Sequence, residues 1–269
     1  MMLSSNLRPR GRRVIAISGV FTGAWLLFPA RLAGQSDFYN TDAGRPFRTQ
    51  DALVVERGAL ELHLPTLQWS RAGDLNRWRF EPEVALGILP RTQFDIGADL
   101  AGTRRGNDST DADALFARVV HQLNVESLQL PAFAVGLESS KSLHSSGVVW
   151  QGLVAATRTV GAMRVHANVR GRAGSRRDVS SDQWELGLAV DRTLPMRHLL
   201  VGAEVVAVRS SAATHESTWR GGIGARWQWN VRTSLDGGVA RTSGPSGGWQ
   251  VTAGVSTSVA LRLLMGGMR

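Results

Sequence analysis

The stretch RWRFEPEVALGI, residues 77–88, alternates between two kinds of side chain. One parity is apolar and consists of Trp78, Phe80, Pro82, Val84, Leu86 and Ile88. The other is charged or small and consists of Arg77, Arg79, Glu81, Glu83, Ala85 and Gly87. A period of two is typical of a β-strand whose faces meet different surroundings. About eleven such residues, tilted by about 45°, cross a hydrocarbon layer, so the stretch predicts a membrane-crossing strand.

The same alternation recurs along the chain. After residue 35 there is neither a second apolar run of 18 residues nor a sustained helical pattern. Twelve candidate strands follow, at 58–70, 77–88, 92–101, 112–124, 131–139, 148–157, 163–172, 184–192, 198–209, 219–229, 233–241 and 248–262. The sequence therefore predicts an all-β fold, a transmembrane up-and-down antiparallel β-barrel of about 12 strands.

The connectors between these strands alternate in length. Short ones follow the second, sixth, eighth and tenth strands, whereas longer polar or glycine-rich ones occupy 102–111, 140–147, 173–183, 210–218 and 242–248. Outer-membrane barrels have short periplasmic turns and longer extracellular loops. We therefore expect a bacterial outer-membrane location, with both ends of the barrel domain on the short-turn, periplasmic side.

Tryptophans are expected at both ends of the strands. Six lie next to the longer loops, namely Trp69, Trp78, Trp150, Trp184, Trp219 and Trp249, and Trp227 and Trp229 lie at the opposite end. Amphipathic rings at both edges of an apolar band form an aromatic girdle. The alternative is a water-soluble β-sandwich whose ends are capped by tryptophan, but the many small residues on the charged parity favour a crowded polar lumen.

Parity also predicts which side chains line the lumen. These are Arg77, Arg79, Glu81, Glu83, Asp95, Asp99, Arg118, Gln122, Glu138, Arg164, His166, Asn168, Arg170, Glu185, Asp191, Glu204, Arg220, Arg226 and Asp236. Opposed rows of arginine and carboxylate across a narrow bore set its selectivity for solutes. The alternative interpretation is that these groups pair only to satisfy one another in a filled interior.

The first 34 residues are predicted to be a cleaved signal peptide. Arginines precede an apolar run over residues 14–30, and the small residues Ala33 and Gly34 come before Gln35. An uncleaved membrane anchor is the alternative. Residues 35–57 precede the first strand and are expected to form a periplasmic or plug segment, and residues 58–269 the barrel.

Composition excludes several classes of protein. The chain has no cysteine, which removes disulfide scaffolds, thiol nucleophiles and cysteine-ligated metal sites. The net charge of +9 includes five arginines among the first 34 residues, so the remainder carries 26 basic against 22 acidic side chains. We expect no nucleic-acid partner, no cofactor and no metal.

Possible catalytic residues are few. His166 and Asn168 share a strand face with Arg164 and Arg170, whose charge repels a metal cation. His144 and Ser145 lie side by side in an expected loop, unlike the His and Ser of barrel phospholipases, which come from strands. We therefore expect no enzyme, and a lipid hydrolase is only the less favoured alternative.

Several short motifs, taken in order, resemble the MetA-pathway family of phenol-degradation outer-membrane proteins. They are residues 41–50 (TDAGRPFRTQ), residues 87–97 (GILPRTQFDIG), 131–134 (PAFA), 165–169 (VHANV), Glu204 and Asp236 with Gly237. The family opening runs Thr-Asp-Arg-Pro-Asp, whereas here Ala43 and Gly44 intervene and Phe47 replaces the acid. The resemblance implies an outer-membrane channel for aromatic or other hydrophobic compounds and no catalytic residues.

The predicted function is a passive channel for uptake or efflux of small molecules, with aromatic or hydrophobic compounds as the candidate solutes. Its expected partners are outer-membrane lipid, the outer-membrane assembly machinery and a small-molecule solute. A barrel with a structural or surface-recognition role and no solute flux is the main alternative.

Overall fold

The structure of this chain is a computed structural model that describes residues 41, 45–64, 67–106, 108–144, 146–176, 179–180, 182–210, 217–244 and 247–260. The predicted signal peptide lies outside these residues. Among them the only helix is a single 3₁₀ turn, Pro195–Arg197, and no helix is long and apolar enough to cross a membrane.

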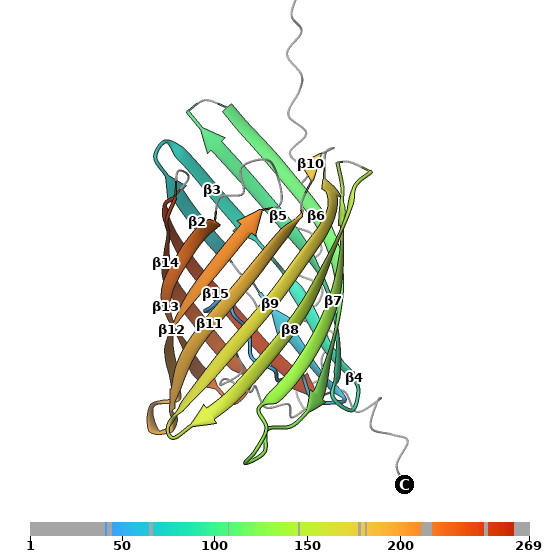
Figure 1. Cartoon of the computed structure of the whole chain (residues 1–269), viewed down its shortest axis with the longest axis vertical. Helices are drawn as coiled ribbons and strands as arrows, with labels where there is room; N and C mark the ends of the chain where they lie inside the picture. Colours follow the sequence, from blue (N-terminus) through green and yellow to red (C-terminus); the bar gives the residue numbers. More distant parts are fainter. Residues whose placement is uncertain are drawn as a thin grey trace, which may run out of the picture. The chain divides into compact units, whose positions relative to one another are not determined.

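Antiparallel strands form one closed sheet (Figure 1). They are β1 (Ala59–His63), β2 (Leu67–Ala72), β3 (Leu75–Phe80), β4 (Glu83–Leu89), β5 (Thr92–Arg105), β6 (Asp108–Asn124), β7 (Ala132–Ser142), β8 (Val148–Val160), β9 (Met163–Arg176), β10 (Val179–Ser180), β11 (Gln183–Leu194), β12 (Leu199–Ser210), β13 (Ser217–Asn230), β14 (Thr233–Thr242) and β15 (Trp249–Ala260).

These elements make a barrel of 12 strands over the described residues. Both β1 and β2 pair with β15, so together they occupy one position in the ring. In the same way β3 and β4 both pair with β5 and together occupy the next position. Ala59 opposite Ala260 closes the barrel. The two-residue strand β10 adds no further position to the ring, because it pairs only with β9. The prediction of a closed barrel of about 12 strands is confirmed.

The predicted boundaries differ from the structure mainly where the strands are longer. The expected loop at 102–111 is mostly a hairpin, because β5 continues to Arg105 and β6 begins at Asp108. Similarly, β9 continues to Arg176. Backbone pairing does not require apolar side chains, and beyond an apolar band both faces of a hairpin can be polar. The alternation that reveals a strand in the sequence is therefore weak there.

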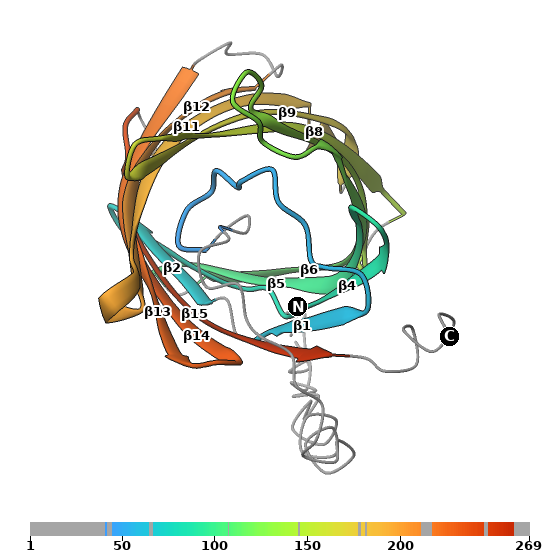
Figure 2. The ribbon, with the colours of Figure 1, turned by 90° about the horizontal axis from the view of Figure 1, so that it is seen from below.

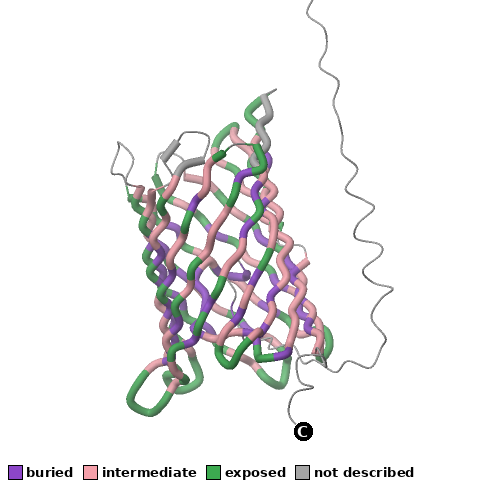
Figure 3. Tube along the Cα trace, turned by 90° about the vertical axis from the view of Figure 1, so that its right-hand side faces the viewer, coloured by how far each residue is buried: buried purple, intermediate pink, exposed green. Residues whose placement is uncertain are grey.

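The two ends of the barrel are named here by their connections. The turn end carries residues 90–91, 161–162, 195–198 and 231–232, together with the longer 125–131. The loop end is the opposite one, where β7, β9, β12 and β14 end and β8, β11, β13 and β15 begin. Buried and exposed residues alternate along most strands in Figure 3. A closed sheet has one inner and one outer face, so this alternation separates two environments.

Candidate functional site: the bore of the barrel

The predicted lumen residues share the inner face of the barrel. Directly opposed pairs on neighbouring strands lie on the same face of a sheet, and the register places Arg118 opposite both Asp95 and Glu138. Likewise Arg170 lies opposite Glu185. Arg164 faces Asp191 and Arg226 faces Asp236 in the same way. Opposite charges are thus neighbours on the inner face, where each can compensate the other.

One charge cluster lies on the wall formed by β1 and β3 to β7. Arg118 is at its centre, with Nε 2.6 Å from Asp95 Oδ2 and Nη2 2.8 Å from Glu83 Oε1. Its Nη1 is 3.7 Å from Glu138 Oε2. Arg79 lies beside this group and contacts Asp99 at 2.8 Å and Glu81 at 3.0 Å. Arg77 lies nearer the loop end, where its Nε donates to Thr103 Oγ1 at 3.4 Å.

A second cluster lies on the wall formed by β9 to β14. The side chain of Arg170 donates to Glu185 at 2.7 Å, and Arg220 pairs with Glu204. Nearer the turn end, Arg164 donates to Asp191 at 2.7 Å. There, too, Arg226 pairs with Asp236. These carboxylates and most of the arginines are buried, so their mutual pairing offsets the cost of removing charge from water.

Residues 45–57, called the inner segment below, run around the inside of the barrel (Figure 2). Its backbone N–H groups donate to side chains of the wall. The N–H of Thr49 donates to Glu204 at 2.9 Å, and that of Gln50 donates to Asn168 Oδ1 at 2.8 Å. Similarly, the N–H groups of Ala52 and Val55 donate, each at 2.8 Å, to Thr157 Oγ1 on β8 and Gln93 Oε1 on β5. Wall side chains thus accept hydrogen bonds from these backbone N–H groups, which would otherwise be buried without a partner.

Ion pairs also hold the inner segment. Arg48 pairs with Glu185, and Asp51 Oδ2 is 3.6 Å from Arg164 Nη1. The guanidinium of Arg226 also donates to the carbonyl of Arg45 at 3.2 Å. The segment is therefore bound to the second wall through β9, β11, β13 and, through Glu204, β12.

Glycines on the inner face make room for this segment. A Cβ atom on Gly224 would lie 2.7 Å from Pro46 Cβ, and one on Gly187 would lie 2.6 Å from Thr49 Oγ1. Similarly, one on Gly202 would lie 2.9 Å from Phe47. Such distances are shorter than real Cβ contacts. The small inward residues of β11 to β13 are thus the surface against which the inner segment packs.

An Asp, a His and a Thr form a hydrogen-bonded chain inside the barrel, an arrangement that some hydrolases use. His166 Nε2 lies 2.9 Å from Asp191 Oδ2, and His166 Nδ1 lies 3.0 Å from Thr157 Oγ1. However, His166 has no exposed surface, and the hydroxyl of Thr157 accepts the N–H of Ala52. The chain therefore anchors the inner segment and has no space for a substrate.

A second His–Asp contact lies at the loop end and involves His144. Its Nε2 is 3.0 Å from Asp113 Oδ2 at the exposed loop end. The neighbouring Ser145 lies outside the described residues. Over the same described ranges, no group of three or more His, Asp and Glu side chains is placed to hold a metal ion.

An open hollow with a cavity volume of about 160 Å³ occupies the bore on the loop-end side of the inner segment. Its lining is mostly charged, and Glu83, Glu138 and Arg118 border it together with Arg170 and Arg172. Phe116 and Val149 are the apolar side chains of the lining. The hollow lies within the closed sheet and its wall is polar, so it presents charged and polar groups that water can solvate.

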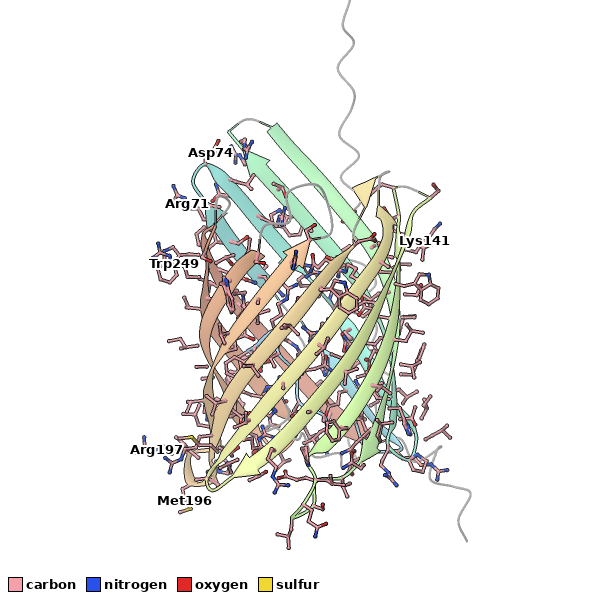
Figure 4. The ribbon with its side chains drawn as sticks, in the orientation of Figure 1. Arg71, Asp74, Lys141, Met196, Arg197 and Trp249 are labelled. Atoms are coloured by element: carbon pink, nitrogen blue, oxygen red, sulfur yellow. The ribbon has the colours of Figure 1, made fainter. Side chains whose placement is uncertain are left out.

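The outer face of the barrel is apolar. Ile96, Leu137, Leu188 and Ile223 are each more than half exposed although they are large apolar side chains. All eight tryptophans of the predicted girdle are exposed as well: Trp69, Trp78, Trp150, Trp184, Trp219, Trp227, Trp229 and Trp249. Figure 4 shows Trp249 projecting outward from the wall, with Arg71 and Lys141 closer to the loop end. An outer apolar band with aromatic edges fits a lipid environment.

Several residues of the bore escaped sequence prediction. His63 is buried between Glu61 and Glu83, at 3.2 Å from each. The alternation of Leu60, Leu62 and Leu64 with Glu61 and His63 would have revealed this pair. Arg172 continues the parity of Arg170, at the last residue of the predicted strand. Phe116 and Val149 carried no such signal, because inward apolar residues break the pattern from which the lumen was predicted.

Comparison with solved structures identifies the fold. The COG4313 outer membrane channel from Pseudomonas putida F1 superposes with a TM-score of 0.56 at 9% identity, over 77% of this chain and 98% of that one. The KdgM porin has a TM-score of 0.52 at 9% identity, over 74% and 98%. The translocator domain of autotransporter NalP from Neisseria meningitidis has a TM-score of 0.52 at 12% identity, over 76% and 90%.

The fold is that of an outer-membrane β-barrel. The apolar outer band and the girdle agree with this fold and with the predicted location in the bacterial outer membrane. No family model matches the sequence, and no curated protein matches it. The likeness concerns the fold, which porins and other channels share with autotransporter domains. The resemblance to the MetA-pathway family stays a prediction.

Proposed function

We propose that this protein is a passive channel for small solutes, with a bore whose width is set by the inner segment. The hollow supports this proposal. Apolar packing would stabilise a closed barrel better than a charged, water-accessible cavity does, so the cavity indicates a role other than stability. The charged residues that line it would admit polar solutes and exclude large ones. Structural neighbours named as porins or outer membrane channels support a channel role.

The solute class is inferred from the lining of the hollow and from the motif resemblance. The motif resemblance favours aromatic or hydrophobic compounds, and Phe116 and Val149 provide a small apolar surface for them in the hollow. The remaining lining is charged or polar. One solved structure is the KdgM porin with an oligogalacturonate, an acidic sugar chain. We propose small polar solutes, including those with a small aromatic or aliphatic part.

A barrel with a structural or surface-recognition role is the competing proposal. The observation in its favour is the inner segment, whose residues Phe47, Thr49 and Ala52 are fully buried within the barrel. If this segment seals the bore completely, the hollow is a closed vestibule and no solute crosses.

Planar-bilayer recording on the purified full chain, combined with liposome swelling, separates these proposals. We expect discrete conductance steps, fast swelling with a pentose and little swelling with a trisaccharide, since the segment narrows the bore. Benzoate compared with cyclohexanecarboxylate tests for an aromatic preference. A folded barrel that gives neither conductance nor swelling would overturn the channel proposal and favour the structural one.

A further inference from the structure

The hollow lies between two walls of opposite charge balance. On one side four carboxylates line it, Glu81, Glu83, Asp99 and Glu138, with only two guanidinium groups, those of Arg79 and Arg118. His63 also borders this wall, but it lies against Glu61 as well as Glu83. Even with His63 protonated, the four lining carboxylates would outnumber the three positively charged groups of this wall.

The facing wall has the reverse balance. Five guanidinium groups line it, from Arg170 and Arg172 on β9, Arg220 on β13, and Arg45 and Arg48 of the inner segment, with only one lining carboxylate, Glu185. In the ring, β9 lies four strands from β5, and β13 lies four strands from β3 in the other direction. The two groups of strands thus face each other across the bore.

Local pairing does not cancel this division. On the acidic wall, Arg79 is shared by Glu81 and Asp99, and Arg118 is shared by Glu83, Asp95 and Glu138. On the basic wall, Arg48 and Arg170 share Glu185, and Arg220 pairs with Glu204 behind the lining. Arg45 lies 3.9 Å from Asp236, which also pairs with Arg226, so the five lining guanidinium groups still outnumber the carboxylates that they contact. Excess negative charge on one side and positive charge on the other produces a field across the bore, which low-dielectric walls concentrate.

We infer that the hollow selects small zwitterionic solutes of the amino-acid type over neutral solutes of the same size, an inference that rests on the proposed channel function. Such a solute places its carboxylate toward Arg172 and Arg220 and its ammonium toward Glu138 and Glu83. A simple anion or cation is attracted by one wall and repelled by the other, whereas a zwitterion gains at both.

The lining also offers a place for an apolar side group. Phe116 on β6 lies opposite Ser140 on β7, which lies opposite Val149 on β8. These residues form one row of the hollow between the acidic residues of β4 and β5 and the arginines of β9. One row closer to the turn end, Glu138 lies opposite Gln151, and Gln151 lies opposite Arg172. Opposite charges thus flank a neutral amide, with an apolar patch beside it.

Liposome swelling with two isomeric probes tests the inference on the purified full chain. Alanine is a zwitterion at pH 7, and lactamide has the same atoms and nearly the same size but no charge. We expect alanine to enter at least about threefold faster than lactamide through the wild-type protein, because the charged walls raise its local concentration. Equal rates would overturn the inference and leave the channel proposal intact. The absence of flux for both probes would overturn the channel proposal, and the inference with it.

A double variant identifies the residues responsible. Glu138→Gln with Arg172→Gln keeps the net charge and nearly the shape of the lining but weakens both walls, so the ratio of alanine flux to lactamide flux should fall toward one. The matched control is Asp74→Asn with Arg105→Gln, an exposed pair 3.7 Å apart outside the hollow, which should retain the full preference. Unboiled and boiled gel mobility confirms that each variant is folded. An unchanged preference in the first variant would overturn the assignment.

Discussion

Leu188 and Ala189 are consecutive residues of β11 with opposite surroundings. Leu188 is 56% exposed on the outer face, whereas Ala189 is 5% exposed and lies opposite the buried His166 on the inner face. Lipid around the outer apolar band offers no polar partners, whereas the inner face is built of charges that require them. Large apolar side chains therefore contribute most on the outside by facing lipid, and carboxylates contribute most on the inside by accepting hydrogen bonds.

The largest effect is expected from removing an inner carboxylate. Glu204 accepts the N–H groups of Arg48 and Thr49 and pairs with Arg220. Glu204→Ala leaves a buried guanidinium and two N–H groups without this acceptor and should lower the free energy of unfolding by about 3–5 kcal/mol. Denaturant unfolding in lipid vesicles measures the loss. Glu138→Ala is the control, because Arg118 retains Glu83 and Asp95, and equal losses in the two variants would contradict the account.

The outer face predicts a somewhat smaller effect. Leu188→Arg places a charge near the middle of the apolar band and should cost about 2–4 kcal/mol, with less heat-modifiable folded protein after reconstitution. The same substitution on the inner face, Gln151→Arg, should assemble nearly normally, because the hollow is polar there. Normal assembly of both variants would show that Leu188 does not face lipid.

Two glycines of β13 allow a direct comparison of the faces. Gly224→Val collides with Pro46 of the inner segment, while nothing lies within 4 Å of a Cβ on the outward Gly221. Overpacking at Gly224 should cost about 1–3 kcal/mol and should raise conductance by displacing the segment. Gly221→Val should leave both stability and conductance unchanged. Equal conductance in the two variants would show that the inner segment does not pack against Gly224 in the membrane-embedded protein.

The smallest effect is expected in the girdle. The guanidinium of Arg241 lies 5.3 Å from the ring centroid of Trp249 on the outer face. Arg241→Gln should lower the free energy of unfolding by about 0.5–1 kcal/mol, the usual contribution of an exposed cation–π contact. The control Arg192→Gln changes an exposed arginine of β11. A larger loss of unfolding free energy in the control would show that the Arg241–Trp249 contact does not stabilise the barrel.

Period-two alternation was sufficient to predict the barrel, because lipid and lumen impose different side chains on alternate residues of each strand. The positions of Arg118, Glu185 and the girdle tryptophans followed from parity for the same reason. The prediction missed the outer part of the β5–β6 hairpin, because backbone pairing there leaves no side-chain pattern in the sequence.

The path of the inner segment could not be predicted from sequence in the same way. Its main contacts are backbone N–H groups that donate to Glu204, Asn168 and Thr157, and any residue type can supply a backbone N–H. The inward glycines were visible in the sequence, but Gly187 and Gly224 could be interpreted only once Thr49 and Pro46 were seen against them. The charge division of the hollow likewise depends on which strands face each other across the bore.

Single-channel conductance of the full chain and of a variant lacking residues 45–52 tests the central claim, that this barrel is a passive channel narrowed by its inner segment. The account predicts a small, steady conductance for the full chain and a severalfold larger one for the variant, with both proteins showing the gel mobility of a folded barrel. Equal conductance in the two folded proteins would contradict it, because the bore would then be set by the wall alone.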